Sequence, residues 1–170
     1  TDLTLKQARD AAIHGVDAEY IRELADLGFT DISVEEAIKS KIHGVSKRKT
    51  GNLKKAGLTD LTLKQSRDAA IHGVDEEYVR ESIALNDRGM SYLTSAFDDL
   101  GLSYIPSVGN FISFRVPDGV DAMEIYSGLL KQGVIVRPVA NYEMPEYLRV
   151  SIGTESENET FIRALQKVLA

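Results

Sequence analysis

Hydrophobic and polar positions repeat along the first 74 residues with a period of 29. The segments "TDLTLKQARDAAIHGV", "TDISVEEAIKSKIHGV" and "TDLTLKQSRDAAIHGV" begin at residues 1, 30 and 59. Apolar residues recur at helical spacing in each segment, and Gly15, Gly44 and Gly73 supply the left-handed residue that ends a helix. A second helix is expected after each glycine. The pattern predicts helical hairpins, which bury their apolar stripes by stacking on neighbouring copies.

Residues that favour helix starts occur at the same positions in every copy. The first helix of each hairpin has a capping box, in which a hydroxyl and a side chain three residues later bond each other's free backbone N–H groups. These boxes are Thr4 with Gln7, Ser33 with Glu36, and Thr62 with Gln65. The second helices are expected to follow the N-cap residues Asp17, Ser46 and Asp75.

The repeat stops in its third copy. Asn86 stands where a helix-ending glycine is due, and no further "TDLT" follows it. One apolar stripe continues instead through Val79, Ile83, Met90, Leu93, Phe97 and Leu100. A single helix from Asp75 to Leu100 is therefore expected, despite Gly89.

Beyond Leu100 the apolar pattern changes from helical to alternating. The segments "YIPSVGNFISFRV" (104–116), "VIVRPV" (134–139) and "YLRVSIG" (147–153) are rich in β-branched and aromatic residues and predict strands. Helices are expected at 121–133 and 156–170, with capping boxes of Asp121 with Glu124 and Ser156 with Glu159. The predicted fold class is α+β: helical-hairpin repeats at 1–74 continue through a shared long helix into an α/β two-layer sandwich at 75–170.

Composition and charge exclude several classes of protein. The 170 residues include no cysteine, so disulfides and thiolate metal sites are excluded, and the net charge of −6 argues against nucleic acid as a partner. No run of about 18 apolar residues occurs, so no membrane partner is expected. We expect a soluble cytoplasmic protein, or a recombinant product because the chain begins with Thr1.

The three histidines, His14, His43 and His72, share one position of the repeat. Equivalent positions in stacked hairpins lie about 10 Å apart. That spacing is too wide for one ion whose ligands lie at about 2 Å. We predict no metal site, and expect each histidine to interact with the carbonyl end of its helix.

A basic segment stands out in this acidic chain, because residues 37–59 contain no acidic residue. Its cations are Lys39, Lys41, Lys47, Arg48, Lys49, Lys54 and Lys55. One interpretation is a patch for an anion or an acidic partner. The other, which we favour, is a solvated helix face near the acidic helix that starts at residue 75.

Two arginines lie on predicted strands, Arg137 in "VIVRPV" and Arg149 in "YLRVSIG". Because strand side chains alternate, both point away from the apolar face formed by Val136, Leu148 and Val150. The planar guanidinium grips carboxylate or phosphate oxygens in pairs. Solvated strand arginines without a ligand are the simpler alternative.

Two long stretches resemble a known enzyme family. "ALNDRGMSYLTSAFDDLGLSYIPSVGNFISF" and "GLLKQGVIVRPVANYEMPEYLRVSIGTESENETFIRALQKVL" closely resemble the C-terminal small domain of histidinol-phosphate aminotransferase, a fold-type-I enzyme that uses pyridoxal phosphate. The resemblance covers roughly residues 75–170, with "GVIVRP" and "YLRVSIG" at the family's spacing. It implies that Arg149 binds the substrate α-carboxylate and that Arg137 contacts the substrate phosphate.

The rest of the chain departs from that family. The family's large domain supplies the Schiff-base lysine, the aspartate paired with the pyridine nitrogen and most of the phosphate cup. Its Ser-Lys pair leading to Gly-x-Arg appears nowhere in this sequence. Residues 1–74 resemble, instead, the tandem helical repeats of some bacterial membrane-sensor peptidases.

These observations lead us to expect a chimera of helical repeats and an aminotransferase small domain. The near-identity of the first and third copies indicates a designed scaffold without catalytic activity, for which no cofactor is expected and no partner is required. In the resembled family, the large domain covers one face of the sandwich. A second copy of this chain would cover the same face, which makes a homodimer a candidate. The alternatives are weak phosphate or carboxylate binding through Arg137 and Arg149, or a partner-binding repeat module that uses the basic residues between 39 and 55.

Overall fold

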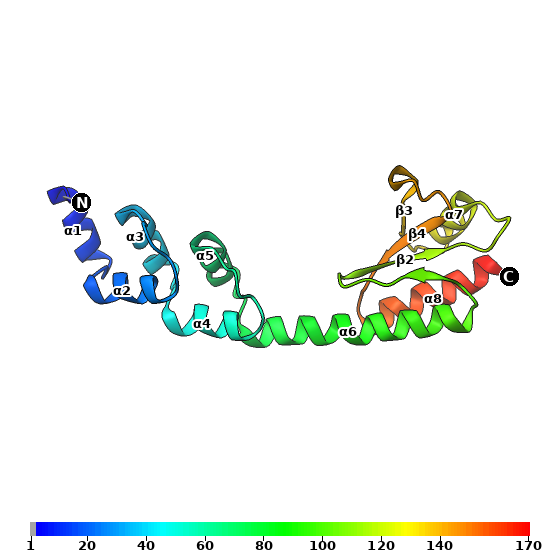
Figure 1. Cartoon of the computed structure of the whole chain (residues 1–170), viewed down its shortest axis with the longest axis horizontal. Helices are drawn as coiled ribbons and strands as arrows, with labels where there is room; N and C mark the ends of the chain where they lie inside the picture. Colours follow the sequence, from blue (N-terminus) through cyan, green and yellow to red (C-terminus); the bar gives the residue numbers. More distant parts are fainter. Residues whose placement is uncertain (1–2) are drawn as a thin grey trace. The chain divides into compact units, whose positions relative to one another are not determined.

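The computed structural model describes residues 3–170, and the chain divides into two compact units, Thr1–Glu81 and Ser82–Ala170. Helix α6 crosses this division, which lies a few residues after the boundary expected at residue 74 (Figure 1). The predicted α+β class is confirmed, with hairpin repeats in the first unit and a four-stranded sheet in the second. No helix within residues 3–170 is long and apolar enough to cross a membrane.

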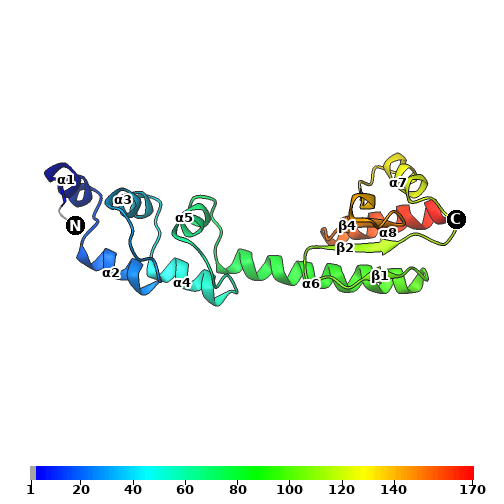
Figure 2. The ribbon, with the colours of Figure 1, turned by 45° about the horizontal axis from the view of Figure 1, so that its top comes forward.

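Short helices of equal length build the repeats of the first unit. Their bounds are α1 Leu5–Ile13, α2 Ala18–Asp26, α3 Val34–Ile42, α4 Lys47–Lys55 and α5 Leu63–Ile71. In Figure 2, α1, α3 and α5 lie in one row, and α2 and α4 lie in another. Each helix starts 29 residues after its counterpart in the preceding hairpin, and the start of α6 at Glu76 keeps this register. The predicted period is therefore a structural period.

The helix ends follow the predicted rules. The hydroxyls of Thr4, Ser33 and Thr62 each accept the N–H three residues later at 3.2 Å. The closing glycines have the left-handed φ that the prediction requires, 68° at Gly15 and 67° at Gly73. All three capping boxes are confirmed.

Contacts between successive hairpins hold the first unit together. The Tyr20 hydroxyl of α2 donates to the Val45 carbonyl of the second hairpin at 3.1 Å, and the tyrosine is 2% exposed. Leu24 and Ala37 are fully buried beside it. The first hairpin thus buries its apolar residues against the second, as expected for stacked repeats.

Helix α6 runs without interruption over Glu76–Asp99, which confirms the predicted single helix. Its N-terminus obeys the repeat, because the Asp75 carboxylate accepts the Tyr78 N–H at 2.9 Å. Leu93 and Phe97, near its C-terminus, are fully buried in the core of the second unit.

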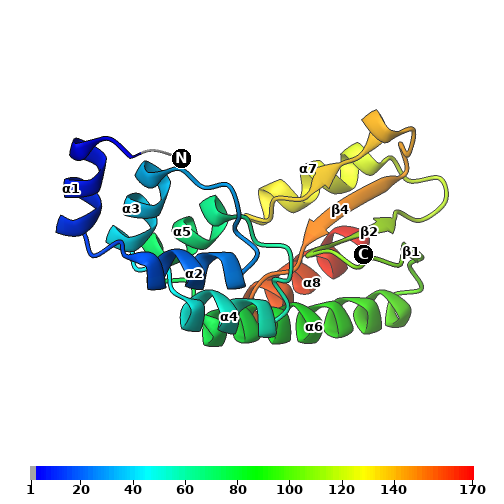
Figure 3. The same ribbon diagram turned by 60° about the vertical axis from the view of Figure 1, so that its left-hand side comes forward.

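The sheet of the second unit is antiparallel, with strand order β1-β2-β4-β3. The strands are β1 Tyr104–Ile105, β2 Phe111–Arg115, β3 Arg137–Pro138 and β4 Tyr147–Ser151. The helices are α7 Ala122–Lys131 and α8 Glu155–Leu169, with a 3-10 turn, η1, at Ala140–Tyr142. Figure 3 shows α8 beside α6 on one side of β2 and β4.

One apolar core joins the buried sheet face to the helices. The rings of Phe97 in α6, Phe114 in β2 and Phe161 in α8 lie 5.0 to 6.1 Å apart. Ile125 of α7 and Leu148 of β4 are buried in the same cluster. The two-layer sandwich is therefore confirmed, with the helices packed on one face of the sheet.

The predicted strands are longer than the observed ones. The segment 104–116 divides into β1 and β2, and only Arg137–Pro138 of the segment 134–139 is a strand. The Val134 N–H closes α7 by donating to the Leu129 carbonyl at 3.0 Å. Pro138 has no N–H to continue the ladder, and η1 begins directly afterwards.

Two predicted capping boxes are wrong. The Asp121 carboxylate accepts the Met123 N–H at 2.9 Å, whereas the Glu124 N–H donates to the Asp121 carbonyl at 3.0 Å. Helix α8 starts two residues earlier than expected, because the carboxylate of Glu157 accepts both the backbone N–H and the hydroxyl of Thr154 at 2.7 Å. These bonds lower the pKa of Glu157.

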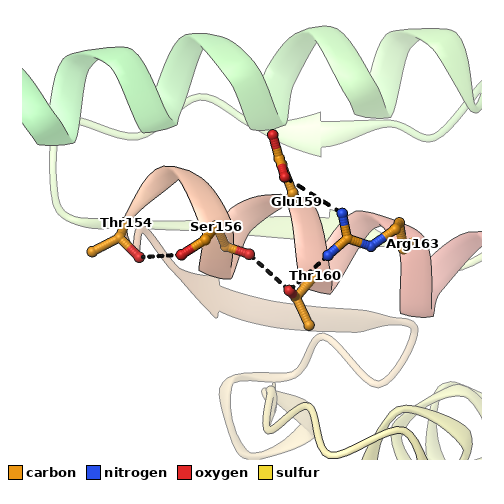
Figure 4. A network of polar contacts seen from close by, with 5 residues as sticks. All are labelled: Thr154, Ser156, Glu159, Thr160 and Arg163. Carbon is orange, nitrogen blue, oxygen red and sulfur yellow. Dashed lines mark hydrogen bonds and ion pairs between the residues drawn. The ribbon is translucent and has the colours of Figure 1, made fainter.

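The predicted partners at this helix start have other roles. The Glu159 carboxylate lies 3.4 Å from Arg163 Nη1, and the Ser156 hydroxyl lies 3.3 Å from that of Thr154 (Figure 4). Thr160 donates to the Ser156 carbonyl at 2.7 Å and accepts from Arg163 at 3.0 Å. This exposed network follows the first turns of α8 and does not cap it.

Two glycines inside helices, one in α4 and one in α6, predict opposite effects of alanine. At Gly51 in α4 no atom lies within 4 Å of an added Cβ, whereas at Gly89 in α6 a Cβ meets the Ile152 side chain and lies 2.9 Å from Asn158 Nδ2. Gly51→Ala should raise the free energy of unfolding of the first unit by about 1 kcal/mol. Gly89→Ala should lower that of the second unit by about 1–3 kcal/mol, because overpacking exceeds the gain in helix propensity.

Urea titration followed by residue-resolved NMR checks both glycine variants in their own units. Stabilisation of the second unit by Gly89→Ala would contradict the close approach of α6 to Ile152 and α8.

Burial of Tyr20 predicts a loss of stability at high pH. Burial, helped by the charge of Glu23, raises the pKa of this phenol from 10.0 to about 12. The unfolded chain releases the proton first, so the stabilisation is complete below pH 10.0 and is lost as the pH rises to about 12. Urea unfolding of the first unit at a series of pH values should show this slope. Tyr20→Phe should remove most of it, and an unchanged slope in that variant would contradict the assignment.

Candidate functional site

The open face of the sheet brings the two predicted arginines together. Arg149 of β4 pairs in register with Arg137 of β3 on one side and with Ser113 of β2 on the other. Leu148 and Val150, which flank Arg149, are buried on the opposite face. The predicted alternation of β4 is confirmed, and the strand order places the two guanidinium groups on neighbouring strands.

An aromatic ring supports one of these arginines. The guanidinium carbon of Arg149 lies 4.7 Å from the centre of the Phe111 ring, and the arginine is half-buried. Arg137 is exposed. A guanidinium stacked on a ring loses conformational freedom but keeps its N–H groups for an anion. Arg149 is therefore the better oriented of the two.

The arginine pair is a local excess of positive charge. Like charges directly opposite each other on adjacent strands destabilise a sheet. Neither Arg137 nor Arg149 forms an ion pair within residues 3–170, whereas Arg115 lies 2.8 Å from the Asp118 carboxylate. An anion bound between Arg137 and Arg149 would remove the repulsion, so the geometry suits a carboxylate or phosphate ligand.

Phe111 and Ser113 are site residues that the sequence analysis missed. Both lie on β2, and Ser113 is buried although it faces away from the core. The alternation in "NFISF" places Phe111 and Ser113 on one face, but only the pairing of β2 with β4 places them beside Arg149.

The second unit does not fit a Schiff-base cofactor such as pyridoxal phosphate. Its only lysines in the sequence are Lys131 and Lys167, which lie on α7 and α8 in the helical layer. Lys167 Nζ donates to Gln132 Oε1 at 3.0 Å. No lysine of this unit is therefore on the open sheet face that carries the arginines.

Three of the seven predicted basic-patch residues contact the preceding hairpin. Lys47 pairs with Asp26 at 2.7 Å, which raises the pKa of the lysine. Lys54 donates to the Leu27 carbonyl at 2.7 Å, and Lys41 Nζ lies 4.2 Å from the centre of the Tyr20 ring. The other four are exposed: Lys39, Arg48, Lys49 and Lys55. A partner for this patch stays a prediction.

The histidines lie at helix ends, as expected. His14, His43 and His72 are the C-cap residues of α1, α3 and α5. Within residues 3–170 no group of three or more His, Cys, Asp or Glu side chains is placed to hold a metal ion.

Comparison with known proteins identifies the second unit. The sequence profile of the family "Aminotransferase class I and II" matches residues 46–165. Histidinol-phosphate aminotransferase from Methylobacillus flagellatus is 57% identical over 95 residues, which are 56% of this chain and 25% of that protein. Histidinol-phosphate aminotransferase 2 from Nitrosospira multiformis is 57% identical over 91 residues, 54% of this chain and 23% of that protein. The chain thus spans about a quarter of these relatives.

Solved structures show the same fold at low sequence identity. The histidinol-phosphate aminotransferase from Clostridium acetobutylicum is 21% identical, with a TM-score of 0.55, and the match covers 73% of this chain and 38% of that one. A putative aminotransferase from Burkholderia pseudomallei is 19% identical, with a TM-score of 0.53 over 81% of this chain and 38% of that one.

These matches correct one expectation and confirm another. The expectation of a designed chimeric scaffold is wrong, because natural aminotransferases are 57% identical to more than half of the chain. The resemblance of residues 75–170 to histidinol-phosphate aminotransferase is confirmed, while that of residues 1–74 to peptidase repeats stays a prediction. With its profile matched over residues 46–165, this chain belongs to the class I and II aminotransferase family.

Proposed function

We propose that residues 82–170 act as the substrate-binding small domain of a histidinol-phosphate aminotransferase-like enzyme. In this proposal Arg149 binds the carboxylate of a substrate that carries one, and Arg137 contacts the phosphate of a substrate that is a phosphate ester. The observation that carries the proposal is the register pair of Arg137 and Arg149, two cations without an ion-pair partner in residues 3–170. The identity of 57% to histidinol-phosphate aminotransferases supports the choice of substrate class.

The environment of each arginine favours a different task. Arg149 is half-buried and stacked on Phe111 at 4.7 Å, which suits repeated binding of one planar carboxylate in a fixed orientation. Arg137 is exposed and followed by Pro138, so its side chain has more freedom. A tetrahedral phosphate accepts bonds from several directions and needs less exact orientation.

Catalysis needs more of the enzyme than these residues supply. The relatives are about four times as long as the matched segment, and the lysines of the second unit lie in its helical layer. We therefore expect the 170-residue chain to bind substrate weakly and to carry out no transamination by itself. A rise of keto-acid product above the rate without protein would contradict this expectation.

A pair of related ligands tests the two arginine roles. L-Histidinol phosphate and L-histidine share an imidazole and an amine, but the first carries a phosphate ester and the second a carboxylate. In NMR titrations of the full chain, both should give saturable shifts at Ser113, Arg137 and Arg149. Arg137→Gln should weaken histidinol phosphate more, and Arg149→Gln should weaken histidine more, each by about tenfold or above, as expected for a lost charge-assisted bond.

Arg163→Gln is the matched control, because Arg163 is an exposed arginine of α8 paired with Glu159. It should leave both affinities within about twofold of the wild type, because α8 packs on the face of the sheet opposite the arginines. Titrations that never saturate, or equal losses in all three variants, would contradict the proposal.

A further inference from the structure

A pocket of about 840 Å³ opens between the second and third hairpins of the first unit. Its walls come from α4, α5 and the first turns of α6, and all of its lining residues lie between 45 and 81. They include Lys49, Leu53, Ser66, Ala69, Ala70 and Val74. The volume lies in the range typical of small-molecule sites, roughly 300–1,000 Å³.

In the corresponding interface between the first and second hairpins, a tyrosine side chain fills the space. There the Tyr20 ring is 2% exposed, its hydroxyl donates to the Val45 carbonyl at 3.1 Å, and the Lys41 ammonium lies 4.2 Å from the ring centre. Ala37 is buried beside the ring. A phenol ring therefore fills the interface between the first two hairpins.

The 29-residue register gives the counterparts of these residues in the next interface. Lys49 replaces Tyr20, Ala70 replaces Lys41, and Val74 replaces Val45. Lys49 is exposed, so its flexible chain does not fill the space that the tyrosine ring occupies in the first interface. Part of the pocket thus lies where the first interface holds one aromatic ring and the lysine that covers it.

Ser66 gives this empty space a polar anchor. It takes the place of Ala37, is 2% exposed and lines the pocket. Its hydroxyl has no hydrogen-bond partner within residues 3–170. Buried hydroxyls nearly always find a partner, so an unpaired one that lines a pocket points to a ligand with a polar atom.

We propose that this pocket binds a small monocyclic phenol in place of the missing tyrosine ring. The ring lies against Leu53, Ala69 and Ala70, and its hydroxyl bonds to Ser66 or to the Val74 carbonyl. This site lies in the first unit and is independent of the arginine face of the second unit. Binding of a phenol at this site requires apolar contact with its ring and one or two neutral hydrogen bonds to its hydroxyl.

The probe for this site is p-cresol, which is the tyrosine side chain as a free molecule. NMR titration of the full chain should give saturable shifts of the amides of Ser66, Ala69, Ala70 and Val74. Lys49→Tyr supplies the ring covalently and should reduce p-cresol affinity at least tenfold. The control Lys55→Tyr adds the same ring at an exposed position of α4 outside the pocket, and should leave the affinity within twofold.

A second variant tests the site by a gain of binding. Ala70→Lys restores the cation that lies over the ring in the first interface, and a cation–π contact of about 0.5–1 kcal/mol corresponds to a two- to fivefold gain in p-cresol affinity. Shifts that do not saturate, or an affinity that is unchanged by both Lys49→Tyr and Ala70→Lys, would overturn the proposal.

Discussion

The contact between the rings of Phe97, Phe114 and Phe161 is the interaction on which the second unit depends. It joins α6, β2 and α8 at ring separations of 5.0 to 6.1 Å and fixes which face of β2 points inward. Because β2 pairs with β4, the same choice buries Leu148 and turns Arg149 outward. A slip of one residue in β4 would bury the arginine and expose the leucine, so the core also orients the candidate site.

Helix α6 satisfies two different sets of constraints along its length. At its start it keeps the 29-residue register and the N-cap of the repeats, through Asp75. The repeat core residue that is Leu24 in α2 and Leu53 in α4 becomes the exposed Ser82 in α6. From that residue on, the apolar stripe serves the second unit, where Leu93 and Phe97 are fully buried. The repeat therefore ends by the loss of one core side chain, without a break in the helix.

Local rules predicted the features that depend on neighbouring residues alone. The repeat helices, their capping boxes and the continuous α6 follow from periodicity and cap chemistry, and the alternation of β4 gives the direction of Arg149. Contacts that reach beyond one helical turn or one strand decided the rest. "TESENE" offers two overlapping capping boxes, Thr154 with Glu157 and Ser156 with Glu159. The box at Thr154 is used, and beside it Asn158 exchanges two bonds of 3.0 Å with the Gly153 backbone. The position of Arg137 beside Arg149 depends on the pairing of β3 with β4. The sequence of either strand alone does not predict this pairing.

The central proposal is that the fold holds together, as an anion site, two arginines that have no ion-pair partner within residues 3–170. The free energy of unfolding of the second unit in Arg137→Gln, measured at low salt with and without phosphate, tests it most directly. Without phosphate the variant should be more stable than the wild type, because the repulsion between neighbouring guanidinium groups is removed. With phosphate the wild type should gain stability and the difference should shrink or reverse. A variant that is less stable without phosphate, and whose difference from the wild type does not change with phosphate, would contradict the account.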